Sequence, residues 1–308
     1  MSVTCKQCGA TFKTLRGLHS HVKVHGGQEV YYHTHYPRLD LHDGSLIKFK
    51  NKDRYFSTFF NSSENREAYY SSAPVSESRK VYLEEFLAHA KYKNIDFIPC
   101  DNYFKFSNLS GVKVIKKLFE SCACFADQSN LKQIYTEKLP KSFWDRDKRL
   151  DEMTVFVDTR EQKPFKFKNS IINKLDFGDY VASGNFFNKT YVDRKSLEDF
   201  KGTFGKGYQR FKQEAERAKQ FDSYLFVVVE ASIKQIEQEN ETSRHPSKLN
   251  YIFHNVRDFL LSYPESGQIV FCDSREEAND ITKRILFNGP ILWDCDFQYF
   301  LDQRHGLE

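Results

Sequence analysis

The sequence predicts an α/β fold for its C-terminal half, with a mixed sheet flanked by helices. Continuous apolar runs at 227–229 and 269–271 are typical of strands that are covered on both faces, and they predict strands at 225–230 and 268–272. Shorter stretches rich in β-branched and aromatic residues add strands at 154–158, 180–183 and 190–195. Helical periodicity follows these strands at 208–220, 233–239, 248–261 and 274–286.

The totals restrict the class of protein. With 308 residues, 40% hydrophobic and 29% charged, the chain has the composition of globular domains. The formal charge of +4 is small, so any surface for nucleic acid must be a local patch. No apolar run reaches the roughly 18 to 20 residues that span a bilayer, and the first residues carry no secretory signal. We therefore expect an intracellular protein without a membrane partner, nuclear in a eukaryote and cytoplasmic in a prokaryote or virus.

Four metal-ligating side chains stand near the N-terminus. Cys5 and Cys8 are followed, after a twelve-residue gap, by His21 and His25. Two thiolates on a short hairpin and two imidazoles one helical turn apart converge on Zn²⁺, which supplies folding energy that a small core lacks. With Phe12 as a core residue, residues 1–27 resemble a ββα Cys2His2 zinc finger.

The face with which such a finger reads bases is poor in donors. Around Thr14, Gly17 and Ser20, Arg16 is the one arginine suited to guanine. A single finger also covers only about three base pairs. Two interpretations are open: Arg16 contacts DNA, or the finger docks protein or is structural.

Residues 28–150 predict a small α+β module with a linker. Cationic and aromatic residues alternate at 46–56, a pattern that suits nucleic acid but is more often a half-buried strand. Helices are expected at 76–92 and 112–121. A hydrophilic interdomain linker is expected at 138–152. We expect this module to dock on the substrate or on the C-terminal domain.

Residues 178–199 predict a β-hairpin that reverses at Gly184 and Asn185. Asp179 opens its first strand. Asp193 and Lys195 lie two residues apart near the end of the second, so they share a face, while Arg194 points the opposite way. Two carboxylates and an ammonium suit metal-assisted hydrolysis of a phosphodiester. In isolation, such charges are more often solvated surface residues.

Three motifs occur in the order of a known family. The chain has Val157-Asp158-Thr159-Arg160-Glu161, then Gly178-Asp179-Tyr180, then Asp193-Arg194-Lys195 followed by Asp199. Over residues 153–288 it resembles the XPF-type nuclease domain of the PD-(D/E)xK, restriction-endonuclease-like superfamily. One departure is Asp193, where the family has glutamate. A second departure concerns the region after the nuclease: many relatives have tandem helix-hairpin-helix modules there, and this sequence does not.

The resemblance implies a metal-dependent DNA endonuclease at residues 151–308, of the kind that acts in repair or recombination. It implies Mg²⁺ or Mn²⁺ on Asp179 and Asp193, with Asp158 orienting water or a second metal. Lys195 would stabilise the pentavalent phosphate or position the attacking water. The expected contacts to the DNA backbone are Arg160, Arg194, Lys206 and Arg210.

Branched DNA and pairing with a second copy or a partner subunit are habits of the family, and the sequence does not decide either. Two alternatives come from other functional classes. One is a catalytically inactive DNA-binding scaffold, and the other is a protein-interaction module built on the finger. Nothing in the sequence separates DNA from RNA as the substrate.

Overall fold

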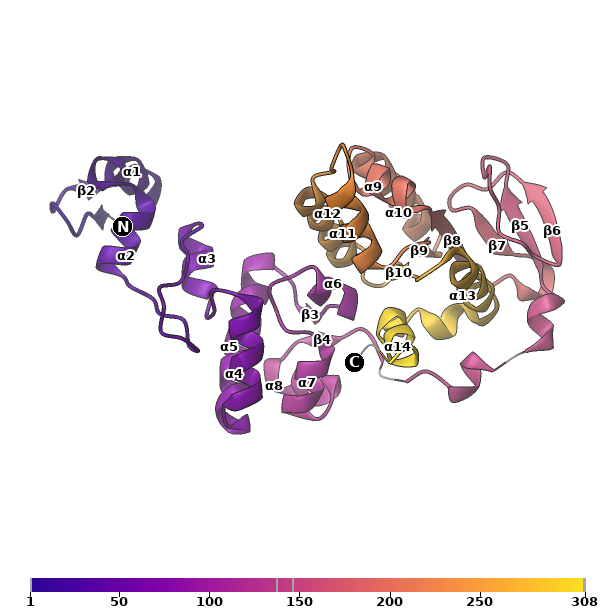
Figure 1. Cartoon of the computed structure of the whole chain (residues 1–308), viewed down its shortest axis with the longest axis horizontal. Coiled ribbons are helices and arrows are strands. Elements are labelled where there is room, and N and C mark those ends of the chain that lie inside the picture. The colour runs from indigo at the N-terminus through magenta and orange to yellow at the C-terminus, as the bar shows by residue number, and fades with distance from the viewer. Residues whose placement is uncertain (1, 137, 146, 307–308) are drawn as a thin grey trace. The chain divides into compact units, whose positions relative to one another are not determined.

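The computed structural model describes residues 2–136, 138–145 and 147–306 (Figure 1). The chain packs as two compact units. The first comprises Met1–Asp96 and Asn108–Leu131, and the second comprises Phe97–Ser107 and Lys132–Glu308. These two packing units do not coincide with the three domains predicted from the sequence, whose boundaries lie near residues 27 and 150. The predicted domains stay a prediction. No helix in the described part of the chain has the length and apolar character needed to cross a membrane.

The first unit begins with a two-stranded antiparallel hairpin, β1 (Val3–Thr4) and β2 (Thr11–Phe12), followed by α1 (Leu15–His21) and the 3-10 helix η1 (Val22–His25). The hydroxyl of Thr14 caps α1 by accepting a hydrogen bond from the N–H of Gly17. Gly26, with a φ of +90°, ends η1 in the left-handed conformation. This order of elements matches the predicted ββα arrangement.

The hairpin and α1 do not form a separately packed domain that a linker joins to the next residues. Helix α2 (Gln28–His35) starts directly after Gly27, and its Tyr31 and Tyr32 are buried against Leu18 and Val22 of the first helices. The same core includes Ile47 and Tyr55, and α3 (Lys52–Ser57) follows a stretch without a strand. The strand predicted at 46–56 is therefore wrong, because Tyr55 reaches this aromatic core from a short helix.

Helices dominate the rest of the first unit. The predicted helices at 76–92 and 112–121 are confirmed as α5 (Val75–Lys93), which begins after Pro74, and α7 (Val112–Phe119). They are joined by α4 (Ser63–Ser72) and α8 (Cys122–Ser129). A buried ion pair links α4 to α5, since Arg66 donates to Glu85 at 2.7 Å.

The second unit is built on a six-stranded mixed sheet, which confirms the predicted fold class. The strand order is β10-β9-β8-β7-β5-β6. Strands β7 and β8 are antiparallel, as are β5 and β7, and the other three pairs are parallel. The strands are β5 (Thr154–Asp158), β6 (Asn169–Asn173), β7 (Tyr180–Ala182), β8 (Thr190–Lys195), β9 (Tyr224–Val229) and β10 (Gly267–Phe271).

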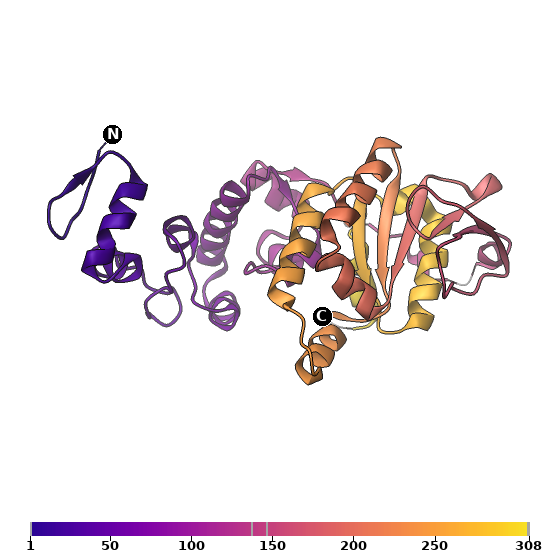
Figure 2. The same ribbon diagram turned by 90° about the horizontal axis from the view of Figure 1, so that it is seen from above.

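Helices cover both faces of this sheet (Figure 2). One face packs against α9 (Leu197–Phe204), α10 (Tyr208–Gln220), α11 (Ile233–Thr242), α12 (Leu249–Ser262) and α6 (Asp101–Lys105). The other packs against α13 (Arg275–Asn288), the 3-10 helix η5 (Gly289–Leu292) and α14 (Phe297–Arg304). Alternate residues of β9 enter the two cores, with Val227 in the first and Val228 in the second.

Three features of this unit were not predicted. Strand β6 is an edge strand with all five residues exposed, and its two apolar residues, Ile171 and Ile172, do not alternate with polar ones. Helix α9 directly follows β8. The stretch at 138–152 contains the 3-10 helices η2 (Lys141–Trp144) and η3 (Lys148–Asp151), and its Phe143 is buried against the sheet, unlike a free linker. A two-residue parallel pair, β3 (Phe97–Ile98) and β4 (Lys132–Gln133), completes the unit.

Candidate active site

Strand β8 presents charges of different kinds to its two faces. Tyr191 of β8 packs against the core that includes α10. Since residues two apart in a strand share a face, Asp193 and Lys195 lie on this same face. The ammonium of Lys195 donates to Asp193 Oδ1 at 2.6 Å. Arg194 points to the opposite face and is buried there. The predicted sharing of a face by Asp193 and Lys195 is therefore confirmed.

Asp179 is brought to the same place by the turn before β7. Its backbone N–H donates to the carbonyl of Val192 at 2.8 Å, and its side-chain Oδ2 accepts the backbone N–H of Arg194 at 2.8 Å. Burial, followed by the negative charge of Asp193, raises the pKa of Asp179 to about 8. The two carboxylates therefore face one another closely enough to repel.

Lys195 stays charged in this setting. Burial acts to lower its pKa, but the negative charges of Asp193 and Asp179 outweigh burial and raise the pKa above the ordinary lysine value. An ammonium held beside two carboxylates does not neutralise both of them. The cluster therefore retains net negative charge when the carboxylates are ionised.

Asp193 has an oxygen without a protein partner. The residue is 3% exposed, and its Oδ2 is buried with no hydrogen bond. A buried carboxylate oxygen without a partner is costly unless something else binds it. Carboxylate oxygens are the donors that Mg²⁺ and Mn²⁺ prefer, so Asp179 and Asp193 fit a divalent cation.

Asp158, at the end of β5, has both oxygens engaged. Arg160 donates to Oδ1 at 2.6 Å and to Oδ2 at 3.2 Å, and the N–H of Leu175 donates to Oδ2 at 2.7 Å. The backbone N–H of Asp158 also donates to the carbonyl of Asp179 at 2.8 Å. In this arrangement Asp158 fixes the loop that leads to Asp179. The guanidinium of Arg160 stays reachable, because its side chain is 62% exposed.

Arg194 is held by a buried network of carboxylates. Its guanidinium makes two hydrogen bonds to Glu161, at 2.9 and 3.1 Å, and one to Glu230 at 3.1 Å. Arg275 pairs with the same Glu230. Since the side chain of Arg194 is 8% exposed, this geometry gives no support to the phosphate contact predicted for it. Glu161 instead holds the Arg194 side chain in place on the face of β8 opposite Asp193 and Lys195.

Glu214 belongs to the cluster, although sequence reasoning gave it no role. It lies on α10 and accepts the backbone N–H of Gly178 at 2.8 Å. Burial, followed by the charge of Asp193, raises its pKa, against the opposing effects of the Gly178 hydrogen bond and Lys195. A signal existed in the sequence: Glu214 stands three residues after Phe211 and four before Ala218, on the apolar face of the helix.

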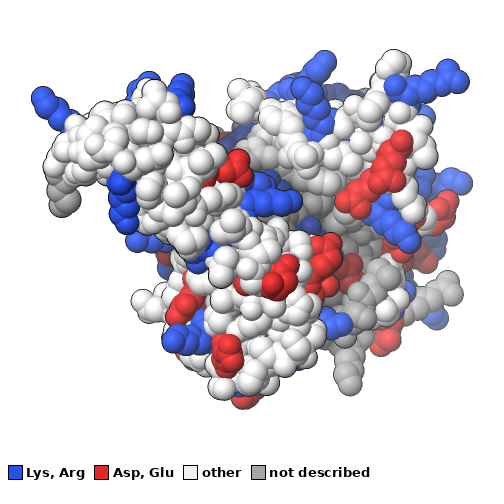
Figure 3. Space-filling view, turned by 60° about the vertical axis from the view of Figure 1, so that its left-hand side comes forward, with Lys and Arg blue, Asp and Glu red and all other residues white. Residues whose placement is uncertain are grey.

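The other predicted contacts to DNA are exposed. Lys206 lies just before α10 and Arg210 in its first turn, and both side chains face solvent. Arg16 is exposed on α1 of the first unit. On the face of the molecule drawn in Figure 3, Lys and Arg are interspersed with Asp and Glu and do not gather into one patch.

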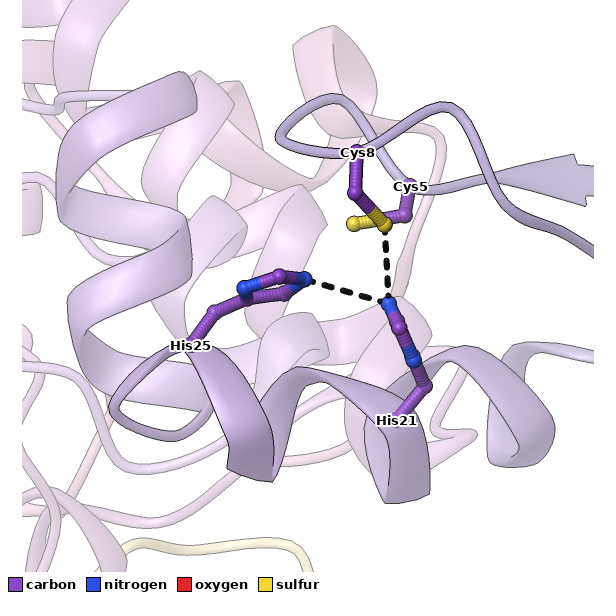
Figure 4. Close-up of side chains that lie close together, drawn as sticks. All are labelled: Cys5, Cys8, His21 and His25. Atoms are coloured by element: carbon purple, nitrogen blue, oxygen red, sulfur yellow. Dashed lines mark hydrogen bonds between the residues drawn. The ribbon is translucent and has the colours of Figure 1, made fainter.

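A second candidate site lies in the first unit. The ligand atoms of Cys5, Cys8, His21 and His25 all lie within 4.8 Å of one another (Figure 4). His21 Nε2 is 3.1 Å from Cys8 Sγ and 3.2 Å from His25 Nε2. Nitrogens of a tetrahedral Zn²⁺ site lie about 3.3 Å apart, given Zn–N distances of about 2.0–2.1 Å. The donor set and its spacing therefore fit Zn²⁺.

The thiol of Cys5 is prepared for such a role by its backbone surroundings. Burial acts to raise its pKa, but hydrogen bonds from the backbone of Cys8 and Gln7 hold the pKa below the ordinary cysteine value. The thiolate is the form that binds metal. None of the cysteines in the described part of the chain forms a disulfide bond.

Comparison with known proteins identifies one related region. Residues 157–285 match the family model described as "ERCC4 domain", and this region carries Asp158, Asp179, Asp193 and Lys195. No curated protein matches the chain. Among solved structures, XPF from Aeropyrum pernix is 18% identical, with 48% of this chain and 72% of that chain covered and a TM-score of 0.34. The same protein in complex with DNA is 19% identical, with coverages of 44% and 64% and a TM-score of 0.33.

Proposed function

We propose that residues 151–308 form a divalent-cation-dependent endonuclease that hydrolyses phosphodiester bonds in DNA. The observation that carries this proposal is the buried, unpartnered Oδ2 of Asp193, with Lys195 on the other oxygen and Asp179 facing it. The match of residues 157–285 to the ERCC4 domain supports the same function. The DNA complex of a similar protein supports DNA as the substrate, and branched DNA is the form to test first.

Each residue of the cluster has a separate task. Asp179 and Asp193 would hold Mg²⁺ or Mn²⁺. When bound, such a cation polarises a phosphoryl oxygen and makes a water molecule more acidic. Lys195 carries a full positive charge beside these carboxylates and stabilises negative charge that develops on the phosphate. Asp158 and Arg160 hold the loop behind Asp179, and Arg160 keeps an exposed side chain toward which a phosphate can approach.

The first unit would carry Zn²⁺ on Cys5, Cys8, His21 and His25. Its part in recognising DNA bases is small. Thr14 is engaged as the cap of α1, and Gly17 has no side chain, so Arg16 and Ser20 are the remaining groups on the expected reading face. The burial of Tyr31 and Tyr32 against α1 favours a structural or docking finger, whose task is to hold residues 3–57 together.

The proposal is tested by cleavage of labelled duplex, single strand, fork, flap, four-way junction and an RNA strand, each with Mg²⁺, Mn²⁺ or EDTA. Wild type is compared with Lys195→Ala and with Lys234→Ala, which changes an exposed lysine on α11. We expect metal-dependent cutting that Lys195→Ala loses and Lys234→Ala keeps. Equal cutting by all three proteins would assign the activity to a contaminant or another site. Absence of cutting with intact DNA binding would favour the inactive scaffold.

A further inference from the structure

Helix α10 is tied to the turn that carries Asp179. Tyr208, Phe211, Ala215 and Ala218 bury one side of this helix against the sheet. Glu214 lies on that same side and makes a 2.8 Å hydrogen bond from the backbone N–H of Gly178. Gly178 is the hydrogen-bond donor found for the Glu214 carboxylate in the described part of the chain. A carboxylate on a buried helix face is costly, so a specific contact is expected there.

The turn at Gly178 is fixed from two sides. Gly178 has a φ of +67°, and a Cβ at this position would lie 3.2 Å from the carbonyl oxygen of Val192 and 3.3 Å from Cβ of Tyr191. The next residue, Asp179, donates its N–H to that same carbonyl. Strand β8 therefore holds one side of the turn, and Glu214 of α10 holds the other.

We propose that Glu214 is a positioning residue of the cation site, which fixes the Gly178–Asp179 turn so that the Asp179 carboxylate faces Asp193 before a cation binds. This proposal rests on the proposed function, because it takes Asp179 and Asp193 as the groups that hold the cation. It adds a residue from outside the three motifs of the sequence. A site whose groups are held in place before binding loses less affinity to ordering.

Positioning explains the contacts of Glu214 better than direct ligation. One of its oxygens already accepts the backbone N–H of Gly178, which ties this carboxylate to the turn. The amide of glutamine has an oxygen that can accept the same N–H, whereas alanine has none. The two substitutions therefore separate a hydrogen-bond acceptor from a charged ligand.

The first measurement is amide hydrogen exchange at Gly178 in EDTA, which does not depend on any cation. Four proteins are compared: wild type, Glu214→Ala, Glu214→Gln and Gln213→Ala, the last being an exposed neighbour on α10. We expect Glu214→Ala to exchange at least about tenfold faster, the factor for losing a hydrogen bond to a charged acceptor. Glu214→Gln and Gln213→Ala should stay within about threefold of wild type. Unchanged exchange in Glu214→Ala would overturn the proposal.

The second measurement is the affinity for Mn²⁺ alone, by calorimetry, in the same proteins. Glu214→Ala should bind Mn²⁺ about tenfold more weakly, while Glu214→Gln should stay close to wild type. Equal weakening in both variants would make Glu214 a charged ligand and overturn the positioning role.

Asp179→Ala and Asp193→Ala separate this inference from the function on which it rests. If these two variants bind Mn²⁺ as wild type does, the proposed cation site is wrong, whatever Gly178 shows. If they lose Mn²⁺ binding while Glu214→Ala keeps it, the site stands and the positioning role of Glu214 falls.

Discussion

Lys195 and Asp193 form a close ion pair on one face of β8, with 2.6 Å between the ammonium and Oδ1, yet the second oxygen of Asp193 is buried without a partner. The pair is therefore incomplete as a structural salt bridge. In the neighbouring Asp158, by contrast, both oxygens accept hydrogen bonds. Asp193 therefore has an oxygen available to the proposed cation, and Asp158 does not.

The raised pKa of Asp179 gives stability without a cation a definite pH dependence. A carboxyl whose pKa is raised to about 8 on folding contributes stability at low pH, and this contribution is lost as pH rises from about 4 through about 8. In EDTA, Asp179→Asn should therefore be more stable than wild type at pH 9, by at least about 3 °C in Tm, with the difference closing toward pH 4. Mn²⁺ should reverse this order at pH 9, because it binds the ionised carboxylate.

The measurement is thermal unfolding followed by tryptophan fluorescence. Both tryptophans of the chain, Trp144 and Trp293, lie in the second unit, so the signal reports that unit. Asp222→Asn, at an exposed position on the same unit, serves as the control. A pH-independent difference between wild type and Asp179→Asn would contradict the raised pKa.

Arg194 should matter for stability more than for DNA. Arg194→Ala leaves the buried Glu161 carboxylate without its guanidinium partner, while Glu230 keeps Arg275. Breaking a buried ion pair in this way costs about 3–5 kcal/mol. Arg210→Ala, at an exposed position, should change the free energy of unfolding by less than about 0.5 kcal/mol. Urea unfolding measured by tryptophan fluorescence compares the two. An Arg194→Ala protein of wild-type stability with weakened DNA affinity would instead support the predicted phosphate contact.

The sequence predicted those elements whose burial follows from a local pattern of apolar residues, and it missed those whose burial depends on distant residues. Strands β8 and β9 and helix α10 were predicted within a residue, because their apolar patterns match the burial that the sheet imposes. Strand β6 could not be predicted in this way, because its two apolar residues, Ile171 and Ile172, are adjacent and both exposed, so apolar and polar residues do not alternate. The error at 46–56 has a similar cause: Tyr55 is buried by aromatic residues of α2, which local periodicity does not report.

The candidate site divides in the same manner. Asp179, Asp193 and Lys195 lie close together in sequence and share motifs, so their convergence was predictable from the alternation of a strand. Their roles in catalysis stay predictions. Glu214 and the engagement of Arg194 by Glu161 and Glu230 depend on contacts across the sheet and its helices, and residue spacing alone does not specify such partners.

Removal of zinc should loosen the first unit beyond the four ligands. Tyr31, Tyr32 and Tyr55 pack on the helix that carries His21, so residues 3–57 share one core. A zinc chelator, or Cys8→Ser, should therefore raise amide exchange throughout residues 3–57, while tryptophan-detected unfolding of the second unit stays unchanged. Cys124→Ser, at an exposed cysteine outside the quartet, is the control. If exchange rises only at residues 3–25, residues 26–57 are stable without zinc and the prediction is wrong. Metal analysis of the wild-type protein should find one zinc per chain.

Lys206 and Arg210 should contribute to DNA affinity through phosphates, without regard to sequence. Both side chains are exposed at the start of α10, the helix that Glu214 ties to the turn of Asp179. Each neutralised phosphate contact steepens the fall of log affinity with log salt by about 0.9 for duplex DNA and about 0.7 for a single strand. Lys206→Gln and Arg210→Gln should each reduce the slope by about that amount, measured by fluorescence anisotropy in EDTA, while Lys234→Gln on α11 leaves it unchanged. Arg16→Gln is expected to change the slope by no more than one such contact. If neither Lys206→Gln nor Arg210→Gln alters the slope, DNA does not bind along the start of this helix.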